Sequence, residues 1–145
     1  MKPYVIGFYG ESNSGKTTLI VKIINCLSKE DFRIASVKTS DKKSGIDSEG
    51  KDTWKHSQAG SELVVFSTKN EVDFLLKKNV DNSEIIDCIK KIGKYDIILI
   101  EGANDENIQK IRIGEIKERK NTIFTYNGNF EELINFIKTE IFRRN

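Results

Sequence analysis

The feature that most constrains the fold of this chain is a short segment bounded by glycines. It runs over residues 10–17 and reads Gly-Glu-Ser-Asn-Ser-Gly-Lys-Thr. An apolar run, Tyr4 to Tyr9, precedes it, and apolar residues at helical spacing follow it from Leu19 to Leu27. A buried strand joined to a helix by this spacing is the Walker A or phosphate-loop pattern, G-x-x-x-x-G-K-[ST]. The segment therefore predicts an α/β chain that binds the phosphates of a nucleoside triphosphate.

The residue types in this loop suit the chemistry of a polyphosphate. Successive main-chain amides must point inward, which places residues at backbone angles that only glycine adopts cheaply, hence Gly10 and Gly15. Lys16 is expected to bridge the β- and γ-phosphates, and the Thr17 hydroxyl is expected to bind Mg²⁺. The predicted nucleotide-binding residues are Gly10, Glu11, Ser12, Asn13, Ser14, Gly15, Lys16, Thr17 and Thr18.

Strand and helix patterns alternate along the rest of the chain. Strand patterns occupy residues 4–9, 33–39, 62–67, 71–76, 95–100, 110–116 and 122–126, and helical patterns follow residue 15 and cover 54–59, 83–92 and 130–141. The run 95–100 lacks polar alternation, which is typical of a central parallel strand covered on both faces. The pattern predicts a single domain over 1–145 with a three-layer P-loop NTPase fold and a mostly parallel central sheet.

One carboxylate occupies the position where such a sheet binds its ligand. Ligands lie beyond the carboxyl ends of parallel strands, and Glu101 directly follows the apolar run, whereas Asp96 precedes it. Glu101 is therefore the predicted magnesium or water contact, and together with Lys16 a predicted catalytic residue. The alternative is a carboxylate that binds the backbone amides of the turn at Gly102.

Other polar residues leave several interpretations open. The loop from Ser40 to Gly50 has the length of a switch or substrate-binding segment, or it is a solvated surface loop. Cys26 and Cys88 fall on the apolar stripes of predicted helices and are expected to be small buried hydrophobes. No N-K-x-D guanine signature occurs, so the residues alone do not separate ATP from GTP.

Composition excludes some classes of function. The net charge is only +2 and the lysine pairs are scattered among acids, so nucleic acid is not the expected partner. No apolar run is long enough to cross a bilayer, and the start of the chain lacks a secretory cleavage pattern. The two cysteines among 145 residues suit a reducing compartment. A cytoplasmic protein without membrane contact is the expectation.

Three blocks together resemble the molybdopterin-guanine dinucleotide biosynthesis protein B family over nearly the whole chain. The first is the phosphate loop continuing to Ile20. The second, residues 46–53, reads Ile-Asp-Ser-Glu-Gly-Lys-Asp-Thr and leads to Ala59-Gly60, and it is the block most specific to this family. The third is the strand end at Glu101-Gly102, followed by Lys110-Ile111. The chain departs from the family pattern after Lys38, where Thr39 stands in place of a histidine, and after Gly102.

The resemblance implies a homodimeric GTP-binding protein with weak GTPase activity. Such a protein assists the guanylyltransferase that attaches GMP to molybdopterin during molybdenum or tungsten cofactor maturation. By the same resemblance, Asp47 and the segment 50–52 border the active cleft, which makes Asp47 a further predicted catalytic residue, and Glu101 stands near magnesium. The implied ligands and partners are GTP, Mg²⁺, the guanylyltransferase and molybdopterin.

Two other functions fit the same motifs. A small-metabolite kinase would use the loop from Ser40 to Gly50 to receive a phosphoryl acceptor, although the sequence has no arginine-rich lid. A P-loop accessory protein that acts as a structural dimer module would use Trp54 and the strand from Lys110 to Ile116 as its interface, with nucleotide as a stabilising ligand.

Overall fold

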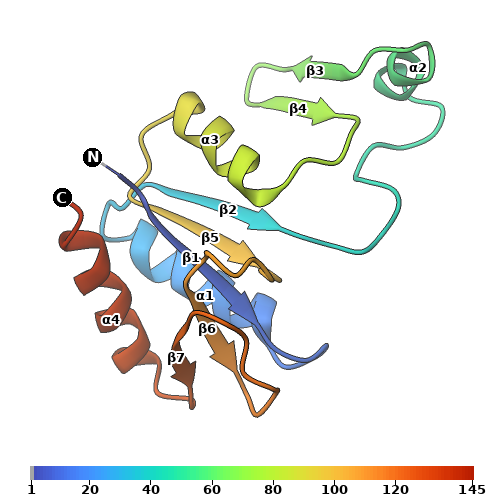
Figure 1. Cartoon of the computed structure of the whole chain (residues 1–145). Coiled ribbons are helices and arrows are strands. Elements are labelled where there is room, and N and C mark those ends of the chain that lie inside the picture. The colour runs from blue at the N-terminus through green and yellow to red at the C-terminus, as the bar shows by residue number, and fades with distance from the viewer. Residues whose placement is uncertain (1) are drawn as a thin grey trace. The chain divides into compact units, whose positions relative to one another are not determined.

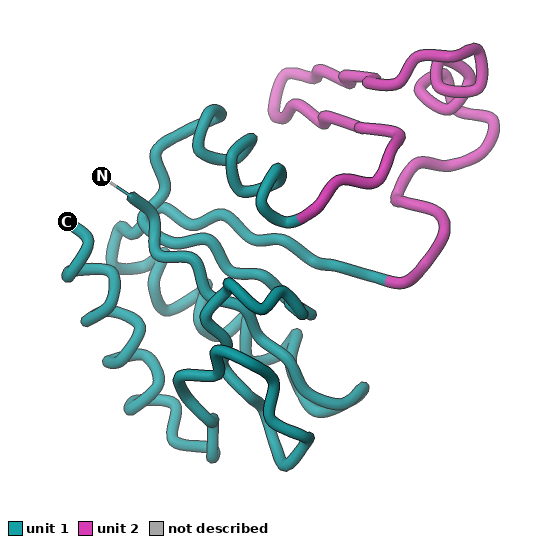
Figure 2. Tube along the Cα trace, viewed as in Figure 1, with its two compact units in different colours: residues 1–40, 82–145 teal, residues 41–81 magenta. Residues whose placement is uncertain are grey.

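The computed structural model describes residues 2–145, and they form two compact units, coloured separately in Figure 2. The first unit runs up to residue 40 and resumes over 82–145. The second unit is the intervening segment 41–81. Each unit is described by itself below, and the single domain expected over 1–145 stays a prediction.

The first unit is built on a sheet of five strands in the order β2-β5-β1-β6-β7. Every neighbouring pair in this sheet is parallel, which confirms the predicted α/β class and parallel sheet. The strands are β1 (Tyr4–Tyr9), β2 (Ile34–Lys38), β5 (Ile97–Glu101), β6 (Lys110–Ile113) and β7 (Thr122–Tyr126).

The strand at Lys110 differs from expectation in two respects. It ends at Ile113 rather than Ile116, because Gly114 turns the chain with a φ of 80°. It also lies inside the sheet, between β1 and β7, and Ile111 is fully buried. The hypothesis that this strand forms a subunit interface is therefore wrong.

Helices cover both faces of the sheet, so this unit has three layers (Figure 1). α1 (Lys16–Ser28) and α4 (Phe130–Phe142) pack on one face, and α3 (Asn82–Ile92) packs on the other. β5 serves both cores, since Ile97 and Leu99 join the first and Ile98 and Ile100 join the second. All four are fully buried, and burying each such side chain contributes about 1.5–3 kcal/mol. This explains why the run lacks polar alternation.

The second unit holds a helix and a hairpin. α2 (Asp52–Gln58) begins two residues before the expected Trp54, and the positive φ of 119° at Gly60 fits the predicted helix stop. β3 (Leu63–Ser67) and β4 (Val72–Leu76) pair antiparallel, with Leu63 opposite Leu76. Within the described residues, these two strands pair only with each other. Both expected strands are therefore confirmed, as a separate two-stranded sheet.

The cysteine expectation is wrong for one of the two residues. Cys26 on α1 is half-buried, but Cys88 on α3 is exposed. α3 contributes no fully buried residue to the core, so its apolar stripe lies at the margin of the second core cluster. Among residues 2–145, no helix is both long and apolar enough to span a membrane.

Candidate functional site

The glycine loop lies between the end of β1 and the start of α1, as the sequence predicts. Asn13 and Gly15 adopt positive φ angles of 64° and 88°, which turn the loop into the helix. Gly15 is the residue that precedes the helix, so its expected need for an unusual backbone angle is confirmed.

Gly10 is required for a different reason from the one expected. It has no positive φ, and a Cβ built at this position would lie 2.8 Å from the carbonyl oxygen of Ile113 and 2.8 Å from Ser14 Oγ. Space rather than backbone angle therefore requires glycine at the base of the loop.

The loop presents unpaired polar groups of the kind that bind an anion. No side chain caps the start of α1, and its first turn contains no acidic residue. The first amides of a helix have no partner within the helix, and the helix dipole places positive potential there. Ser14 Oγ is the one buried side-chain oxygen or nitrogen without a hydrogen-bond partner among the described residues. Thr17 and Thr18 are exposed, so a ligand can reach this end of the helix.

The Lys16 amine folds back across the loop. Its Nζ donates to the carbonyl oxygen of Gly10 at 2.9 Å, which closes the loop from one end to the other. This contact holds a positive charge over the loop. The amine is therefore available to a phosphate that enters the loop.

The predicted partner carboxylate lies beside the helix start. Thr17 Oγ1 donates to Glu101 Oε1 at 2.6 Å, and Lys38 Nζ lies 3.5 Å from the same oxygen. β-sheet register explains the meeting, because Glu101 is paired with Phe8 of β1 on one side and with Lys38 of β2 on the other. The Glu101 side chain is only 13% exposed, against 67% for Lys38. Residues 84 positions apart in the sequence are thus joined at the carboxyl edge of the sheet.

The chemistry of this pair fits a hard divalent cation. A hydroxyl that gives its hydrogen to a carboxylate keeps its lone pairs free, and Mg²⁺ prefers such oxygen ligands together with phosphate oxygens and water. Within residues 2–145, no group of three or more histidine, cysteine or acidic side chains is placed to hold a metal. A magnesium ion here would therefore take most of its ligands from phosphate and water.

The alternative role of Glu101 is wrong. In that alternative the carboxylate would accept hydrogen bonds from the backbone amides of the turn at Gly102. The Gly102 N–H donates instead to the carbonyl oxygen of Phe8 at 2.8 Å. Asp96, at the other end of β5, accepts instead from the Arg33 N–H at 2.7 Å. Of the two acids that bound this strand, Glu101 alone joins the loop.

Thr39, whose side chain holds the backbone that carries this carboxylate, was not identified from the sequence. Thr39 Oγ1 lies 3.0 Å from the carbonyl oxygens of both Glu101 and Gly102. Gly102 has a φ of 87°, and a Cβ there would lie 2.7 Å from Thr39 Oγ1. A threonine after a strand is too common to signal such a role.

A second missed group ties the base of the loop to the following strands. The Tyr9 hydroxyl accepts from the Arg119 N–H at 2.9 Å and lies 2.7 Å from Thr122 Oγ1. The Arg119 guanidinium stacks 4.7 Å from the centre of the Tyr9 ring and donates to the carbonyl oxygen of Ala103. Tyr9 is buried, so these contacts fix the residue from which the loop departs.

Lys110, quoted in the third resemblance block, does not reach the loop. Its side chain is fully buried, and its amine donates to the carbonyl oxygens of Ile108 at 2.8 Å and Lys120 at 2.7 Å. Burial lowers the pKa of this ammonium group. The two carbonyls satisfy a buried cation, so Lys110 holds the segments on either side of β6 together.

Asp47 belongs to the second unit, where its contacts are structural. Its carboxylate accepts from Lys77 Nζ at 2.7 Å, from Thr53 Oγ1 at 2.9 Å and from the Ser48 N–H at 3.1 Å. The hydrogen bond with Lys77 is the main cause that lowers the pKa of Asp47. Asp47 also lines a cavity of about 640 Å³ in this unit, together with Gly50, Lys51 and Asp52. Its predicted place at the nucleotide stays a prediction.

Comparison with known proteins identifies relatives of the chain. The family model described as molybdopterin guanine dinucleotide synthesis protein B matches residues 5–139. A molybdopterin-guanine dinucleotide biosynthesis adapter protein of Haemophilus influenzae is 32% identical over 110 residues, which cover 74% of this chain and 61% of the relative. A putative adapter protein of Methanocaldococcus jannaschii is also 32% identical, over 77% of this chain and 45% of its own length. The chain thus spans about half to three-fifths of these relatives.

Solved structures share the fold. Bacillus subtilis MobB has a TM-score of 0.73 at 17% identity, and the match covers 94% of this chain and 96% of that one. A crystal structure of molybdopterin-guanine biosynthesis protein B has a TM-score of 0.64 at 23% identity, covering 94% and 98%. Because the family model matches residues 5–139, which include the phosphate loop, the chain belongs to the molybdopterin guanine dinucleotide synthesis protein B family.

Proposed function

We propose that the chain binds GTP with Mg²⁺, hydrolyses it slowly, and acts as an adapter in molybdopterin guanine dinucleotide synthesis. The observation that carries the nucleotide part is the pairing of Thr17 with Glu101 at 2.6 Å, beside an uncapped helix start. Family membership supports the adapter part, since two relatives carry that name.

Each residue of the loop has a role in this proposal. The amides from Gly15 to Thr18 bind phosphate oxygens, Lys16 leaves the Gly10 carbonyl to meet the β- and γ-phosphates, and the Thr17 hydroxyl binds the cation. The bound Mg²⁺ neutralises charge on the phosphates. Glu101 orients the Thr17 hydroxyl and would accept a hydrogen bond from a water beside it. Lys38 keeps a positive charge beside Glu101.

Slow hydrolysis is expected because the described site has few groups that would activate water. Apart from the exposed Glu11 of the loop itself, Glu101 is the carboxylate that the described residues join to the loop, and its Oε1 is already shared by Thr17 and Lys38. A cradle that binds triphosphate without positioning the attacking water gives little acceleration. This pattern suits an adapter whose bound nucleotide matters more than its turnover.

The test is a calorimetric titration of the chain with Mg·GTP and Mg·ATP. We expect Lys16→Ala to weaken GTP binding by at least about a hundredfold, because a charge-assisted contact to two phosphates is lost. Glu101→Gln should leave affinity within about threefold and lower the hydrolysis rate by about tenfold or more. Lys29→Ala, at the other end of α1, is the matched control and should change neither quantity.

Other outcomes of this titration would change the proposal. Tighter binding of ATP than of GTP would contradict the guanine assignment. Unchanged hydrolysis in Glu101→Gln would remove Glu101 from the mechanism. Rapid phosphoryl transfer to an added pterin or nucleotide acceptor would favour the small-metabolite kinase.

We also propose that the chain is a homodimer, assembled through the hairpin of the second unit. One face of this hairpin is apolar apart from Ser67 at its end, and its five apolar residues, which are 41–59% exposed, are Leu63, Val65, Val72, Phe74 and Leu76. We call these five residues the hairpin face. A two-stranded sheet is marginally stable alone, and both of its edges lack a strand partner among residues 2–145. A second copy of the same hairpin would cover the face and pair an edge.

A further inference from the structure

A small pocket opens at the end of the sheet opposite the phosphate loop. It lies in the first unit, between the approach to β1, the end of α3 and the start of β5, with a volume of about 270 Å³. Its apolar surface comes from Pro3, Ile89, Tyr95 and Ile98. Ile98 is fully buried by the sheet, so the floor of the pocket is fixed by the core.

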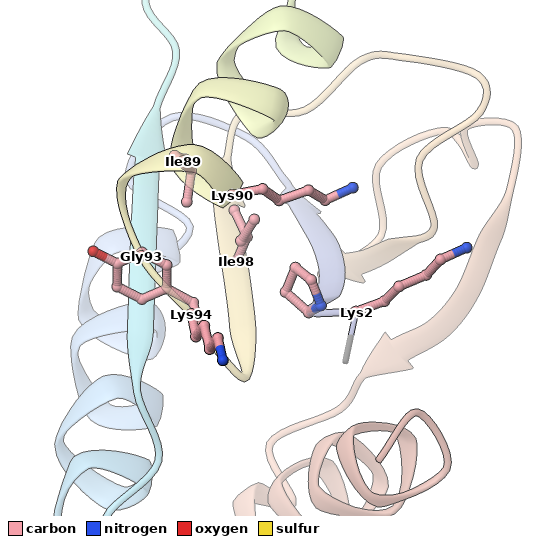
Figure 3. Close-up of a pocket in the computed structure, with 8 residues that line it drawn as sticks. Lys2, Ile89, Lys90, Gly93, Lys94 and Ile98 are labelled. Carbon is pink, nitrogen blue, oxygen red and sulfur yellow. The ribbon is translucent and has the colours of Figure 1, made fainter.

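Three lysines border this apolar floor, and we call the whole the lysine pocket. Lys2, Lys90 and Lys94 line it, and Figure 3 shows Lys2 and Lys90 extending their amines in the same direction, with Lys94 pointing away from them. All three are exposed, and none forms an ion pair within residues 2–145. The nearby carboxylate of Asp96 accepts instead from the Arg33 N–H. The pocket therefore presents three lysine amines without an ion-pair partner around an apolar centre.

Gly93 helps to shape this pocket. A Cβ at Gly93 would lie 3.2 Å from the ring of Tyr95, which is tighter than ordinary van der Waals contact. The absence of a side chain there lets the Tyr95 ring lie against the end of α3. The wall is thus defined by packing rather than by a mobile loop.

The size and charge of the pocket favour one class of occupant. Sites for small molecules and cofactors usually measure about 300–1,000 Å³, so this pocket lies below that range. It suits a single large apolar side chain, of the kind that anchors a protein interface. A lysine rim attracts carboxylates and speeds the association of an acidic partner. Nothing in the phosphate loop or in Glu101 uses this surface.

We propose that the lysine pocket docks an acidic segment of a partner protein, which inserts one apolar side chain between Lys2, Lys90 and Lys94. This inference rests on the adapter function proposed above, since an adapter needs a surface for its partner. The pocket and the phosphate loop lie at opposite ends of β5, so a partner docked here leaves the nucleotide site open. The partner is recognised by its charge and its apolar anchor.

The experiment uses a fluorescein-labelled peptide that carries one leucine between two pairs of glutamates. Fluorescence anisotropy would follow its binding to the full chain at low salt. A second peptide, with alanine in place of leucine, tests the apolar anchor. We expect saturable binding of the leucine peptide and at least about fivefold weaker binding of the alanine peptide.

Charge reversal locates the site. The double variant Lys90→Glu, Lys94→Glu should lower the affinity for the leucine peptide by about tenfold or more. Lys91→Glu is the matched control, because Lys91 is exposed on the same helix end but does not line the pocket. It should keep the affinity within about twofold. Backbone amide shifts in NMR spectra should move at Ile89, Gly93 and Ile98 when the peptide is added.

The outcomes that overturn the proposal are distinct. If Lys91→Glu lowered the affinity for the leucine peptide as much as the double variant does, the peptide would be bound by general charge attraction and not at a docking site. Equal affinity of the two peptides would remove the apolar anchor, and competition by phenyl phosphate alone would assign a small anion to the pocket. Absence of saturable binding would remove the site altogether. Mg·GTP titration of the same samples separates these results from failure of the proposed function, since GTP binding should persist in the double variant.

Discussion

At the scale of single residues, the site depends on close approaches as much as on chemical groups. Ser14, Gly10 and the Ile113 carbonyl meet at the base of the phosphate loop, and Gly102 leaves room for the Thr39 hydroxyl. These contacts fix where the loop and the Glu101 strand end lie relative to each other. The polar groups of the site, Lys16, Thr17 and Glu101, are effective only because the backbone brings them together.

The prediction at this scale concerns Gly10. In Gly10→Ala the new methyl would lie 2.8 Å from the backbone oxygen of Ile113, which cannot move without shifting β6. Overpacking of this kind costs about 1–3 kcal/mol. We expect the free energy of unfolding in urea, followed by circular dichroism, to fall by that amount, with GTP affinity at least about tenfold lower.

Gly45→Ala provides the control for this variant. Gly45 has no positive φ, and a Cβ there would meet nothing within 4 Å. Its stability and affinity should equal those of the unmodified chain. A Gly10→Ala protein that behaved like the Gly45→Ala protein would mean that the loop base is not tightly packed.

At the scale of elements, the periodicity of apolar residues determined which strands and helices could be predicted from the sequence. The strands from Tyr4 to Tyr9 and from Thr122 to Tyr126 were predicted with their observed bounds, because buried apolar runs between turn residues leave little choice. The pairing of Thr17 with Glu101 could also be predicted, because the carboxyl ends of parallel strands lie at the same edge of a sheet. The end of β6 and the hydrogen bonds of Thr39 and Arg119 could not be predicted, because they depend on long-range packing that a local sequence pattern does not encode.

The loop before α2 illustrates the same limit. Asp47 was assigned to the nucleotide by resemblance, whereas in the second unit its carboxylate joins Thr53, the Ser48 amide and Lys77. No sequence spacing predicts that a lysine 30 residues later would pair with it. An aspartate that binds a backbone amide and two side chains is sufficient to order a loop, whatever else it does.

The prediction at this scale is a pH dependence. Because the folded pKa of Asp47 lies below its ordinary value of about 3.8, its stabilising contribution is complete above that value and is lost as the pH falls through the folded pKa. Trp54, the one tryptophan of the chain, lies in α2 and reports on this unit. We expect its fluorescence to change below about pH 4 in the unmodified chain.

In Asp47→Asn the charge on which this transition depends is absent. The tryptophan signal at neutral pH should already resemble the acid form, and the step below pH 4 should shrink. Asp41→Asn, an exposed residue of the same unit, is the control and should titrate like the unmodified chain. An undiminished acid step in Asp47→Asn would assign the transition to another carboxylate.

At the scale of the whole molecule, the two units differ in how they are stabilised. The first unit holds both core clusters and all parallel strand pairs. The second has about 40 residues, near the size below which chains need metals, disulfides or partners to fold. Val64 is its one buried hydrophobic residue among those described. Burial of the hairpin face against a second copy would supply what the unit lacks.

If the homodimer proposal holds, the stability of the second unit depends on protein concentration. Association couples to folding by mass action, so the midpoint of thermal unfolding seen by Trp54 should rise over a hundredfold increase in concentration. Phe74→Glu places a charge on the hairpin face, where Phe74 is 59% exposed, and should yield a monomer in analytical ultracentrifugation with a lower, concentration-independent midpoint. Val21→Glu changes an equally exposed position, 58%, on α1 and should keep the dimer. If the unfolding midpoint of the unmodified chain did not change with protein concentration, the proposal that a second copy covers the hairpin face would be wrong.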